Sequence, residues 1–331
     1  MQEPFDYTQA FAINLGILSP ADQYKLRETR VAVLGLTAGG IIAMQLARSG
    51  VTHFTLLDHG RYEVSDINRD IGCYVDTVGK LKAEVIQQQI RRINPASEVQ
   101  TVTEKLSLEA LQPYIESCDV FFAQSEDLAL SVHALIAAQH ADKLAITVMP
   151  SGLTAYVEVF PPGTRSVLDP AALFGAPENL SYRELSTFLR SPLNRCGRRW
   201  HITDGKWHID WFKRWRDGGE VEAQVCPSMW LGASLAAMEA LKYVTGKWQK
   251  VKAPAMWHSM PSDKKVKVEK YRRRSLYFER FIYWTFGISW LGLGKKYHRY
   301  TARRLARELD YMEKQEATGK KPKLPWNWHW I

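Results

Sequence analysis

Three absences narrow the class of this protein. None of its four cysteines forms a C-x-x-C pair, so neither a zinc site nor a disulfide framework is indicated. The opening residues, MQEPFDYTQAF, contain no apolar leader, and we therefore expect a cytoplasmic protein. The aromatic run near the C-terminus, Phe281–Gly294, has 14 uncharged residues, whereas a membrane-spanning helix needs roughly 20. We therefore expect no transmembrane helix there.

Tryptophan is absent from the first 199 residues, and all twelve tryptophans lie at or beyond Trp200. Charge is divided in the same way. Residues 264–331 contain 18 Lys and Arg against 6 Asp and Glu, a net of +12, whereas residues 1–263 carry a net of −3. The chain thus has a near-neutral front and a basic, aromatic back. The basic part is expected to meet an anionic surface.

Apolar strands alternate with amphipathic helices through the first half of the chain. The sequence predicts strands over 30–35, 53–58, 98–102, 119–124 and 144–149, and helices over 39–49, 78–93, 108–116 and 128–141. Several strands, such as VAVLG and VFFA, are continuous apolar runs, as in parallel strands covered on both faces. We therefore expect an α/β fold with a doubly wound, Rossmann-like, mostly parallel sheet.

The pattern changes after residue 150. Residues 153–160 alternate like an antiparallel strand, the segment WHITDGKWHI suggests a hairpin, a long helix follows Cys226, and 264–270 resembles a last strand. We expect four parts: a Rossmann-like nucleotide-binding region over 1–160, an irregular crossover over 161–225, a return helix and last strand over 226–270, and a basic, Trp-rich tail over 271–331. The tail is expected to be helical, with a charged helix over 302–314.

The turn after the first strand reads Gly35-Leu36-Thr37-Ala38-Gly39-Gly40, with threonine at a position where a nucleotide loop usually has glycine. Backbone N–H groups at the start of a helix bind phosphate, and the Thr37 hydroxyl can add to them. Asp58, which ends the second strand, is placed to accept ribose hydroxyls. We therefore expect Gly35, Thr37, Gly39 and Gly40 to hold a phosphate.

Further segments occur in a fixed order with these: SGVTHFTLLDHGRYEVSDINRD, VGKLKAEVIQQQIRRINP, DVFFAQSED and CPSMWLGASLAAMEALKYVTGK. Together they resemble the ThiF/MoeB/HesA superfamily, adenylating enzymes related to ubiquitin-activating enzymes. The resemblance covers roughly residues 10–160 and 224–247. It implies ATP and Mg²⁺ as cofactors, and attack of a carboxylate on the α-phosphate to give an acyl-adenylate and pyrophosphate.

The resemblance also assigns roles to residues. Asn68, Arg69 and Lys82 match positions that contact the ATP phosphates. Glu126 matches the family's catalytic, magnesium-holding aspartate, and Asp127 stands beside it as a substitute. Cys196 lies near three arginines in the segment where some members carry a reactive thiol.

The sequence departs from the family at several points. Thr37 and Ala38 replace glycines, Glu126 replaces an aspartate, Ile13 stands where an arginine is expected, and the zinc cysteines are missing. Plainer interpretations also stay open. Gly35 and Gly40 can serve helix packing, Asp58 can cap a turn, and Lys82 can be a solvated charge. Cys196 can be an unreactive loop residue.

Three functions are therefore compared. The first is adenylation of a carboxylate on a small carrier protein, a peptide or a metabolite, by a homodimer or by a heterodimer with a related subunit. The second is a non-catalytic scaffold or partner subunit, and the third is an NAD-dependent oxidoreductase. Residues 271–296 suit contact with the inner face of a membrane or docking on protein. Nucleic acid is least favoured, because the aromatic residues cluster apart from the charges.

Overall fold

The computed structural model describes residues 5–163, 170, 176, 179–190, 209–219, 222–252, 255–259, 266–270 and the single positions 307, 311, 314 and 318. The chain divides into two compact units. The first comprises residues 1–170, 224–259 and 263–270, and the second comprises 171–223, 260–262 and 271–331. The first unit contains the sheet and every candidate site residue that the structure describes. The helices described in the second unit are α7 (Tyr182–Arg190) and α9 (Ile209–Arg216).

The first unit is built on an eight-stranded sheet with the order β3-β2-β1-β4-β5-β6-β7-β8. β1 to β5 are parallel, and β6, β7 and β8 add antiparallel pairs at one edge. The strands are β1 (Arg30–Leu34), β2 (His53–Leu57), β3 (Glu98–Val102), β4 (Val120–Ala123), β5 (Leu144–Ser151), β6 (Thr154–Phe160), β7 (Ala255–Ser259) and β8 (Lys267–Lys270).

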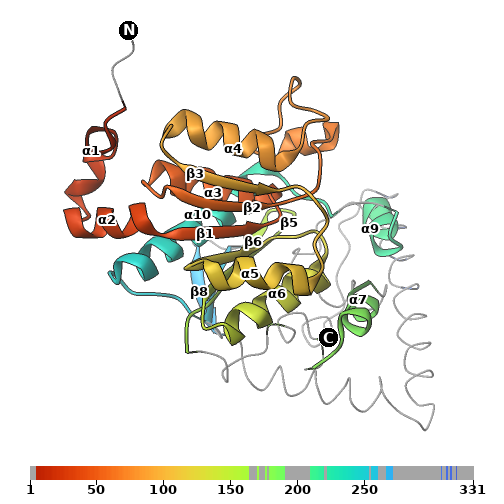
Figure 1. Cartoon of the computed structure of the whole chain (residues 1–331). Helices are drawn as coiled ribbons and strands as arrows, with labels where there is room; N and C mark the ends of the chain where they lie inside the picture. The colour runs from red at the N-terminus through yellow and green to blue at the C-terminus, as the bar shows by residue number, and fades with distance from the viewer. Residues whose placement is uncertain are drawn as a thin grey trace. The chain divides into compact units, whose positions relative to one another are not determined.

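Helices cover both faces of the parallel strands (Figure 1). α3, α4 and α10 pack on one face, and α5 and α6 on the other. The helices of this unit are α1 (Tyr7–Ala10), the 3₁₀ turn η1 (Ala12–Gly16), α2 (Pro20–Glu28), α3 (Thr37–Arg48), the 3₁₀ turn η2 (Val64–Asn68), α4 (Lys82–Ile93), α5 (Leu108–Ser117), α6 (Leu128–His140) and α10 (Cys226–Thr245).

The core lies between the sheet and the layer of α3, α4 and α10. Alternate strand residues such as Val33 and Phe122 enter it, together with Ile41 of α3 and Ala236 of α10. Glu239 of α10 is also fully buried, where it accepts hydrogen bonds from Trp257 Nε1 of β7 at 2.8 Å and from the Val251 N–H of the loop before β7 at 3.0 Å, and pairs within α10 with Lys242 Nζ at 2.6 Å. This helix therefore joins the parallel and antiparallel parts of the sheet.

The expected doubly wound, mostly parallel sheet with antiparallel additions is confirmed. The helix expected to start at Val78 instead starts at Lys82, because Gly79 has a φ of +85° and Leu81 forms a bridge with Arg61. The sequence also missed β7, and it left 161–225 irregular although α7 and α9 lie there. The expected hairpin at 200–209 lies almost wholly outside the described residues, as do Cys196 and most of the expected helix over 302–314.

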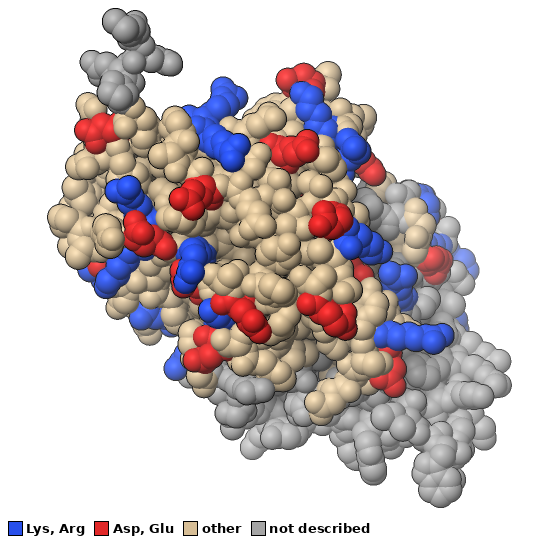
Figure 2. Space-filling model, in the orientation of Figure 1, with Lys and Arg blue, Asp and Glu red and all other residues tan. Residues whose placement is uncertain are grey.

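Charge over the described part of the molecule is mixed. Figure 2 shows basic and acidic side chains interspersed on the face in view, consistent with the near-neutral composition of residues 1–263. Among the described residues, no helix is both long enough and apolar enough to cross a membrane.

Candidate nucleotide site

Three parallel strands end level with one another. Leu34, the last residue of β1, is in register with the last residue of β2 and of β4. Gly35, Asp58 and Gln124, the residues that follow these strands, therefore lie at one edge of the sheet. The strand order reverses between β1 and β4, and in open α/β sheets ligands bind in the crevice at such a point.

Gly35 is required by the backbone. Its φ is +83°, a conformation that residues with a side chain rarely adopt. A Cβ at this position would overlap the carbonyl oxygen of Gln124. The Gly35 N–H donates to the carbonyl of Leu57 at 2.9 Å, which fixes the turn against the end of β2.

The next two candidate glycines allow close packing of α3. A Cβ on Gly39 would overlap the side chain of Val33, and one on Gly40 would lie 3.2 Å from Cδ1 of Ile86. The packing interpretation therefore applies to both residues. It does not compete with phosphate binding, because the first N–H groups of α3, which begins at Thr37, have no acceptor within the helix.

Asp58 ties the end of β2 to two loops. Its Oδ2 accepts the Leu36 N–H at 2.7 Å, and its Oδ1 accepts the Gly60 N–H at 2.7 Å. The structure therefore shows the turn-capping role that the sequence left open for Asp58. A carboxylate offers about four lone-pair positions, so Asp58 retains capacity for a ribose hydroxyl.

Arg69 and Lys82 belong to a buried cluster of four charges. Nζ of Lys82 lies 3.1 Å from Oδ2 of Asp66 and 2.9 Å from Oδ2 of Asp70. Nη2 of Arg69 lies 2.9 Å from Oδ1 of Asp66. Arg69 is 8% exposed and Lys82 is 6% exposed, so Lys82 is not the solvated surface charge that its helix position allows. Burial of paired charges is favourable when the remaining polar atoms are also hydrogen-bonded, and two atoms of this network, Oδ1 of Asp70 and Nε of Arg69, have no hydrogen-bond partner among the described residues.

Thr37 joins this cluster to α3. Its hydroxyl donates to Oδ2 of Asp70 at 3.2 Å and accepts from Nζ of Lys82 at 3.2 Å. The first residue of α3 and the first residue of α4 are therefore in contact, 45 positions apart in the sequence. An ammonium group thus lies at the amino end of α3, where unpaired N–H groups also favour an anion.

The cluster shifts the protonation of its members. Burial raises the pKa of Asp70 to about 6, although the Lys82 ammonium opposes that shift. Burial alone would lower the pKa of Lys82, but the carboxylates of Asp70 and Asp66 outweigh it and hold the pKa above its usual value. Burial also raises the pKa of the Tyr62 hydroxyl, whose ring lies 5.4 Å from the Lys82 ammonium. At neutral pH the lysine is charged and the phenol is neutral.

Asn68 and its neighbour connect this loop to α10. Nδ2 of Asn68 donates to the carbonyl of Gln224 at 3.2 Å, and its Oδ1 accepts from Nη1 of Arg69 at 3.0 Å. The indole N–H of Trp230 donates to the Arg69 carbonyl at 2.9 Å. The amino end of α10 therefore supports the loop that carries the two expected phosphate contacts.

The two expected acidic residues after β4 differ in their surroundings. Glu126 is exposed. Asp127 is the N-cap of α6, where it accepts the Leu130 N–H at 3.2 Å. The carboxylate of Asp127 thus has a local structural role. Glu126 is the better placed of the two to meet a ligand.

The sequence did not single out Asp66 and Asp70. They lie in the polar stretch SDINRD, where acidic residues look solvated, and their only signal was their spacing around Arg69.

Ile13, which replaces an expected arginine, is 94% exposed. Within the described ranges, no group of three or more His, Cys, Asp or Glu side chains is arranged to hold a metal ion.

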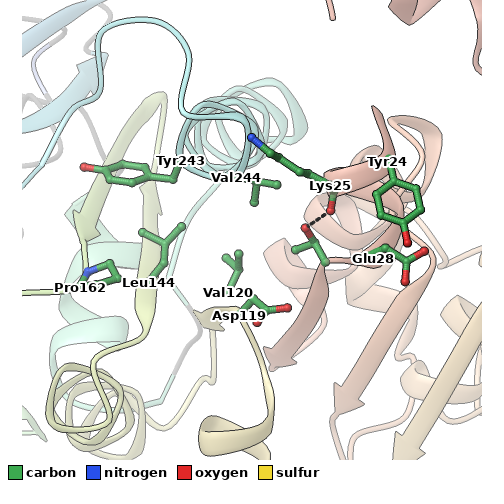
Figure 3. A pocket seen from close by; sticks show the side chains of 10 residues that line it. Tyr24, Lys25, Glu28, Asp119, Val120, Leu144, Pro162, Tyr243 and Val244 are labelled. Carbon is green, nitrogen blue, oxygen red and sulfur yellow. Dashed lines mark hydrogen bonds between the residues drawn. The ribbon is translucent and has the colours of Figure 1, made fainter. Parts of the chain in front are cut away.

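A separate pocket of about 460 Å³ opens at the amino ends of the parallel strands, opposite the carboxyl ends where the candidate nucleotide residues lie (Figure 3). It is bounded by the first residues of β4 and β5, by α2 and by the end of α10. Its lining residues are Tyr24, Lys25, Glu28, Thr29, Asp119, Val120, Leu144, Pro162, Tyr243 and Val244. None of the candidate nucleotide residues is among them.

Residues 10–275 match the profile of the ThiF family. The chain belongs to the ThiF family. The expected resemblance to this family is therefore confirmed over most of the chain.

Relatives of the chain have different functions. The tRNA threonylcarbamoyladenosine dehydratase of Haemophilus influenzae is 32% identical over 111 residues, which is 33% of this chain and 42% of that protein. The sulfur carrier protein ThiS adenylyltransferase of Escherichia coli is 28% identical over 108 residues, 32% of this chain and 43% of the enzyme. The chain thus spans less than half the length of these relatives.

The fold similarity extends further along the chain. PaaA superposes with a TM-score of 0.60 and 19% identity, over 82% of this chain and 85% of PaaA. Escherichia coli MccB, solved with ATP, has a TM-score of 0.59 and 16% identity, over 81% of this chain and 73% of MccB. At these identities the similarity concerns the fold.

Proposed function

We propose that this ThiF-family protein binds ATP with Mg²⁺ at the carboxyl ends of β1, β2 and β4 and uses it to adenylate a carboxylate. The observation that carries the proposal is the contact between Lys82 and Thr37, which brings a cation from α4 to the amino end of α3. A cation beside the free N–H groups of a helix start suits a phosphate.

Further groups at this edge fit the same ligand. Asp58 is placed for the ribose. Nε2 of Gln124 is buried and has no hydrogen-bond partner among the described residues, so it is a donor that a ligand oxygen can satisfy. Mg²⁺ is held by one or two carboxylates together with substrate phosphates, and the exposed Glu126 provides one such carboxylate. Bound there, the ion neutralises phosphate charge.

In the reaction, an oxygen of the acceptor carboxylate forms a bond to the α-phosphorus of ATP. The bond from that phosphorus to the oxygen bridging the β-phosphate breaks, and pyrophosphate leaves with the electron pair. Lys82, Arg69 and the amino end of α3 stabilise the charge on the phosphates, so the protein contributes position and electrostatics. No side chain of the protein exchanges a proton in this step.

The acceptor is a free carboxylate on a carrier protein, a peptide or a metabolite. Escherichia coli MccB, which shares the fold, has been solved with the peptide MccA, and on this basis we favour a peptide or protein C-terminus. We also propose that the protein works as a homodimer or with a related subunit.

A scaffold role is the second candidate, because one observation favours it. Both expected phosphate cations are already paired with buried carboxylates, so the cluster of Arg69, Lys82, Asp66 and Asp70 is neutral without a ligand. A scaffold would bind no nucleotide. Nucleotide titration therefore separates the two functions.

The first test is calorimetric titration of the protein with ATP-Mg²⁺ and, separately, with NAD. We expect ATP to bind and NAD to give no heat. Glu126→Ala should leave binding nearly unchanged but slow ATP–pyrophosphate exchange about 100-fold with peptides that have a free C-terminus. The same peptides with amidated C-termini should support no exchange in any variant.

The matched control is Glu116→Ala, which removes an exposed glutamate at the end of α5, on the opposite edge of the sheet. Its exchange rate should equal that of the wild type. Absence of nucleotide binding would favour the scaffold, and preferential binding of NAD would favour an oxidoreductase. Equal rates for the Glu126→Ala variant and the wild type would remove the assigned role of Glu126.

A further inference from the structure

The three N–H groups of the Lys82 ammonium are all occupied in this structure. A lysine ammonium has three donors. Here they meet Oδ2 of Asp70 at 2.9 Å, Oδ2 of Asp66 at 3.1 Å and the Thr37 hydroxyl at 3.2 Å. The side chain is almost completely buried, so no further donor points to solvent. A phosphate can bind this ammonium only by replacing one of the three.

We propose that Asp70 occupies, in the free protein, the place on Lys82 that a nucleotide phosphate takes in the complex, so that binding breaks the Asp70–Lys82 ion pair. The inference rests on the proposed function, since it assigns a competing group within the same nucleotide site. Asp70 then sets the affinity of the site for phosphates, although it does not itself contact the reacting atoms.

Three groups contact the Lys82 ammonium: the carboxylates of Asp66 and Asp70 and the hydroxyl of Thr37. Of these, Asp70 is held least firmly by its other contacts. Asp66 is held by two other contacts: its Oδ1 accepts from Nη2 of Arg69 at 2.9 Å, and its Oδ2 accepts the Glu63 N–H at 3.0 Å in the capping box of η2. In contrast, Oδ1 of Asp70 is buried and lacks a hydrogen-bond partner within the described part of the chain. The nearest cationic nitrogen on that side, Nε of Arg69, is 3.8 Å away.

Thr37 does not change this ranking. Its hydroxyl donates to Asp70 and accepts from Lys82, so it bridges the same pair. When Lys82 turns to a phosphate, the hydroxyl keeps its bond to Asp70 and the helix start keeps its place. The exchange therefore costs one ion pair, and no backbone has to move.

The exchange is coupled to a proton. Asp70 is faced by Lys82 from α4, by Arg69 and Asp66 from its own loop, and by Tyr62 and Cys73, both of which are neutral at pH 7. Burial already raises the pKa of Asp70 to about 6 while Lys82 opposes the shift. Loss of the Lys82 contact removes that opposition, so the pKa rises further and Asp70 takes up a proton near pH 7. The cluster then carries a net positive charge toward the phosphate.

The test compares the wild type with Asp70→Asn, which keeps the size of the side chain and removes its charge. At pH 7 the variant should bind ATP-Mg²⁺ roughly tenfold more tightly, because the phosphate no longer competes with a carboxylate. Calorimetry in buffers of different ionisation enthalpy should show that the wild type takes up close to one proton more per bound nucleotide than the variant.

Asp76→Asn is the matched control. Asp76 lies in the same loop but is exposed, so its substitution makes the same change in net charge without touching Lys82. Its affinity and proton uptake should match those of the wild type. Equal tightening in both variants would mean a general charge effect and would overturn the inference.

The remaining outcomes separate this inference from the proposed function. ATP binding by the wild type with equal or weaker binding by the folded Asp70→Asn variant would overturn the exchange and leave the nucleotide site standing. No ATP binding by either protein would overturn the nucleotide site and the exchange together. If the Asp70→Asn variant does not fold, proton uptake by the wild type on nucleotide binding tests the exchange by itself. Mg²⁺-bound ATP is fully ionised at pH 7, so it cannot supply the proton that Asp70 takes up. The exchange therefore requires proton uptake from solvent when the nucleotide binds. Absence of this uptake would contradict the exchange.

Discussion

Lys82 and Arg69 share the carboxylates of Asp66 and Asp70 in the interior of the protein. Removing one member of a buried ion cluster leaves an uncompensated charge, which usually costs more than the whole cluster contributes. Any variant of Lys82 therefore changes stability as well as the proposed phosphate binding. The two effects have to be measured separately before a loss of activity is assigned to contact with nucleotide.

Lys82→Met should lower the free energy of unfolding by about 3–5 kcal/mol at pH 7, because it leaves two buried carboxylates with one cation. The double variant Lys82→Met with Asp70→Asn should recover at least half of that loss, since charge balance is restored. Urea denaturation measures both. Lys80→Met, two positions away and exposed, serves as control and should change stability by less than about 0.5 kcal/mol. A recovery of zero would argue against coupling between Lys82 and Asp70.

The residues of this cluster show how much of the site a sequence motif can predict. The sequence selected Arg69 and Lys82 because their pattern resembles an ATP-binding family, and the structure places both at one end of the sheet. It passed over Asp66 and Asp70, because an acid in a polar stretch has no periodic or apolar signal to mark burial. Arg69 is a neighbour in the same loop, but the other partners, Thr37 and Lys82, come from α3 and α4 and are brought to the two acids only by the tertiary fold.

At the scale of elements, the turn between β1 and α3 depends on one backbone conformation. Gly35 has a positive φ and lies against the Gln124 backbone, whereas Gly79 has a similar φ of +85° with no atom within 4 Å of an added Cβ. Both positions require a positive φ, but only Gly35 lacks room for an added Cβ. They therefore form a matched pair for measuring what the close approach contributes.

Gly35→Ala should lower the free energy of unfolding by about 3 kcal/mol, through strain at positive φ and overlap with the neighbouring strand end. Gly79→Ala should lower it by about 1 kcal/mol, through strain alone. Thermal unfolding with matched buffer conditions gives the comparison. Equal losses would show that the turn has room for a methyl group and that the approach to Gln124 is not tight.

Elements with strong local signals were predicted well. The apolar runs that became β1, β4 and β5 are buried on both faces, so their composition alone marks them. The start of α4 was placed four residues early, because an amphipathic pattern cannot show that Gly79 and Leu81 leave helical geometry. The short strand β7 was missed because its place is fixed by pairing with β6, a contact far apart in the sequence.

At the scale of the whole molecule, charge is divided along the chain. Residues 1–263, which contain the proposed nucleotide site, are close to neutral, whereas residues 264–331 have a net charge of +12. A strongly basic segment with tryptophan and tyrosine suits the surface of an anionic membrane. Each basic side chain near such a surface contributes about 1 kcal/mol at physiological salt. The basic run Arg272-Arg273-Arg274 is therefore the natural place to test membrane contact.

Replacement of all three arginines by alanine should weaken binding of the full chain to vesicles containing phosphatidylserine by roughly 100-fold, as measured by co-sedimentation. High salt should weaken wild-type binding in the same way, and vesicles of phosphatidylcholine alone should bind little, because the attraction is electrostatic. The control replaces three exposed cations of the described unit, Lys80, Arg91 and Arg92, and should leave binding nearly unchanged. If both triple variants bind equally, the basic tail does not contact lipid, and a concentration-dependent loss of self-association in the tail variant would place it against a second copy instead.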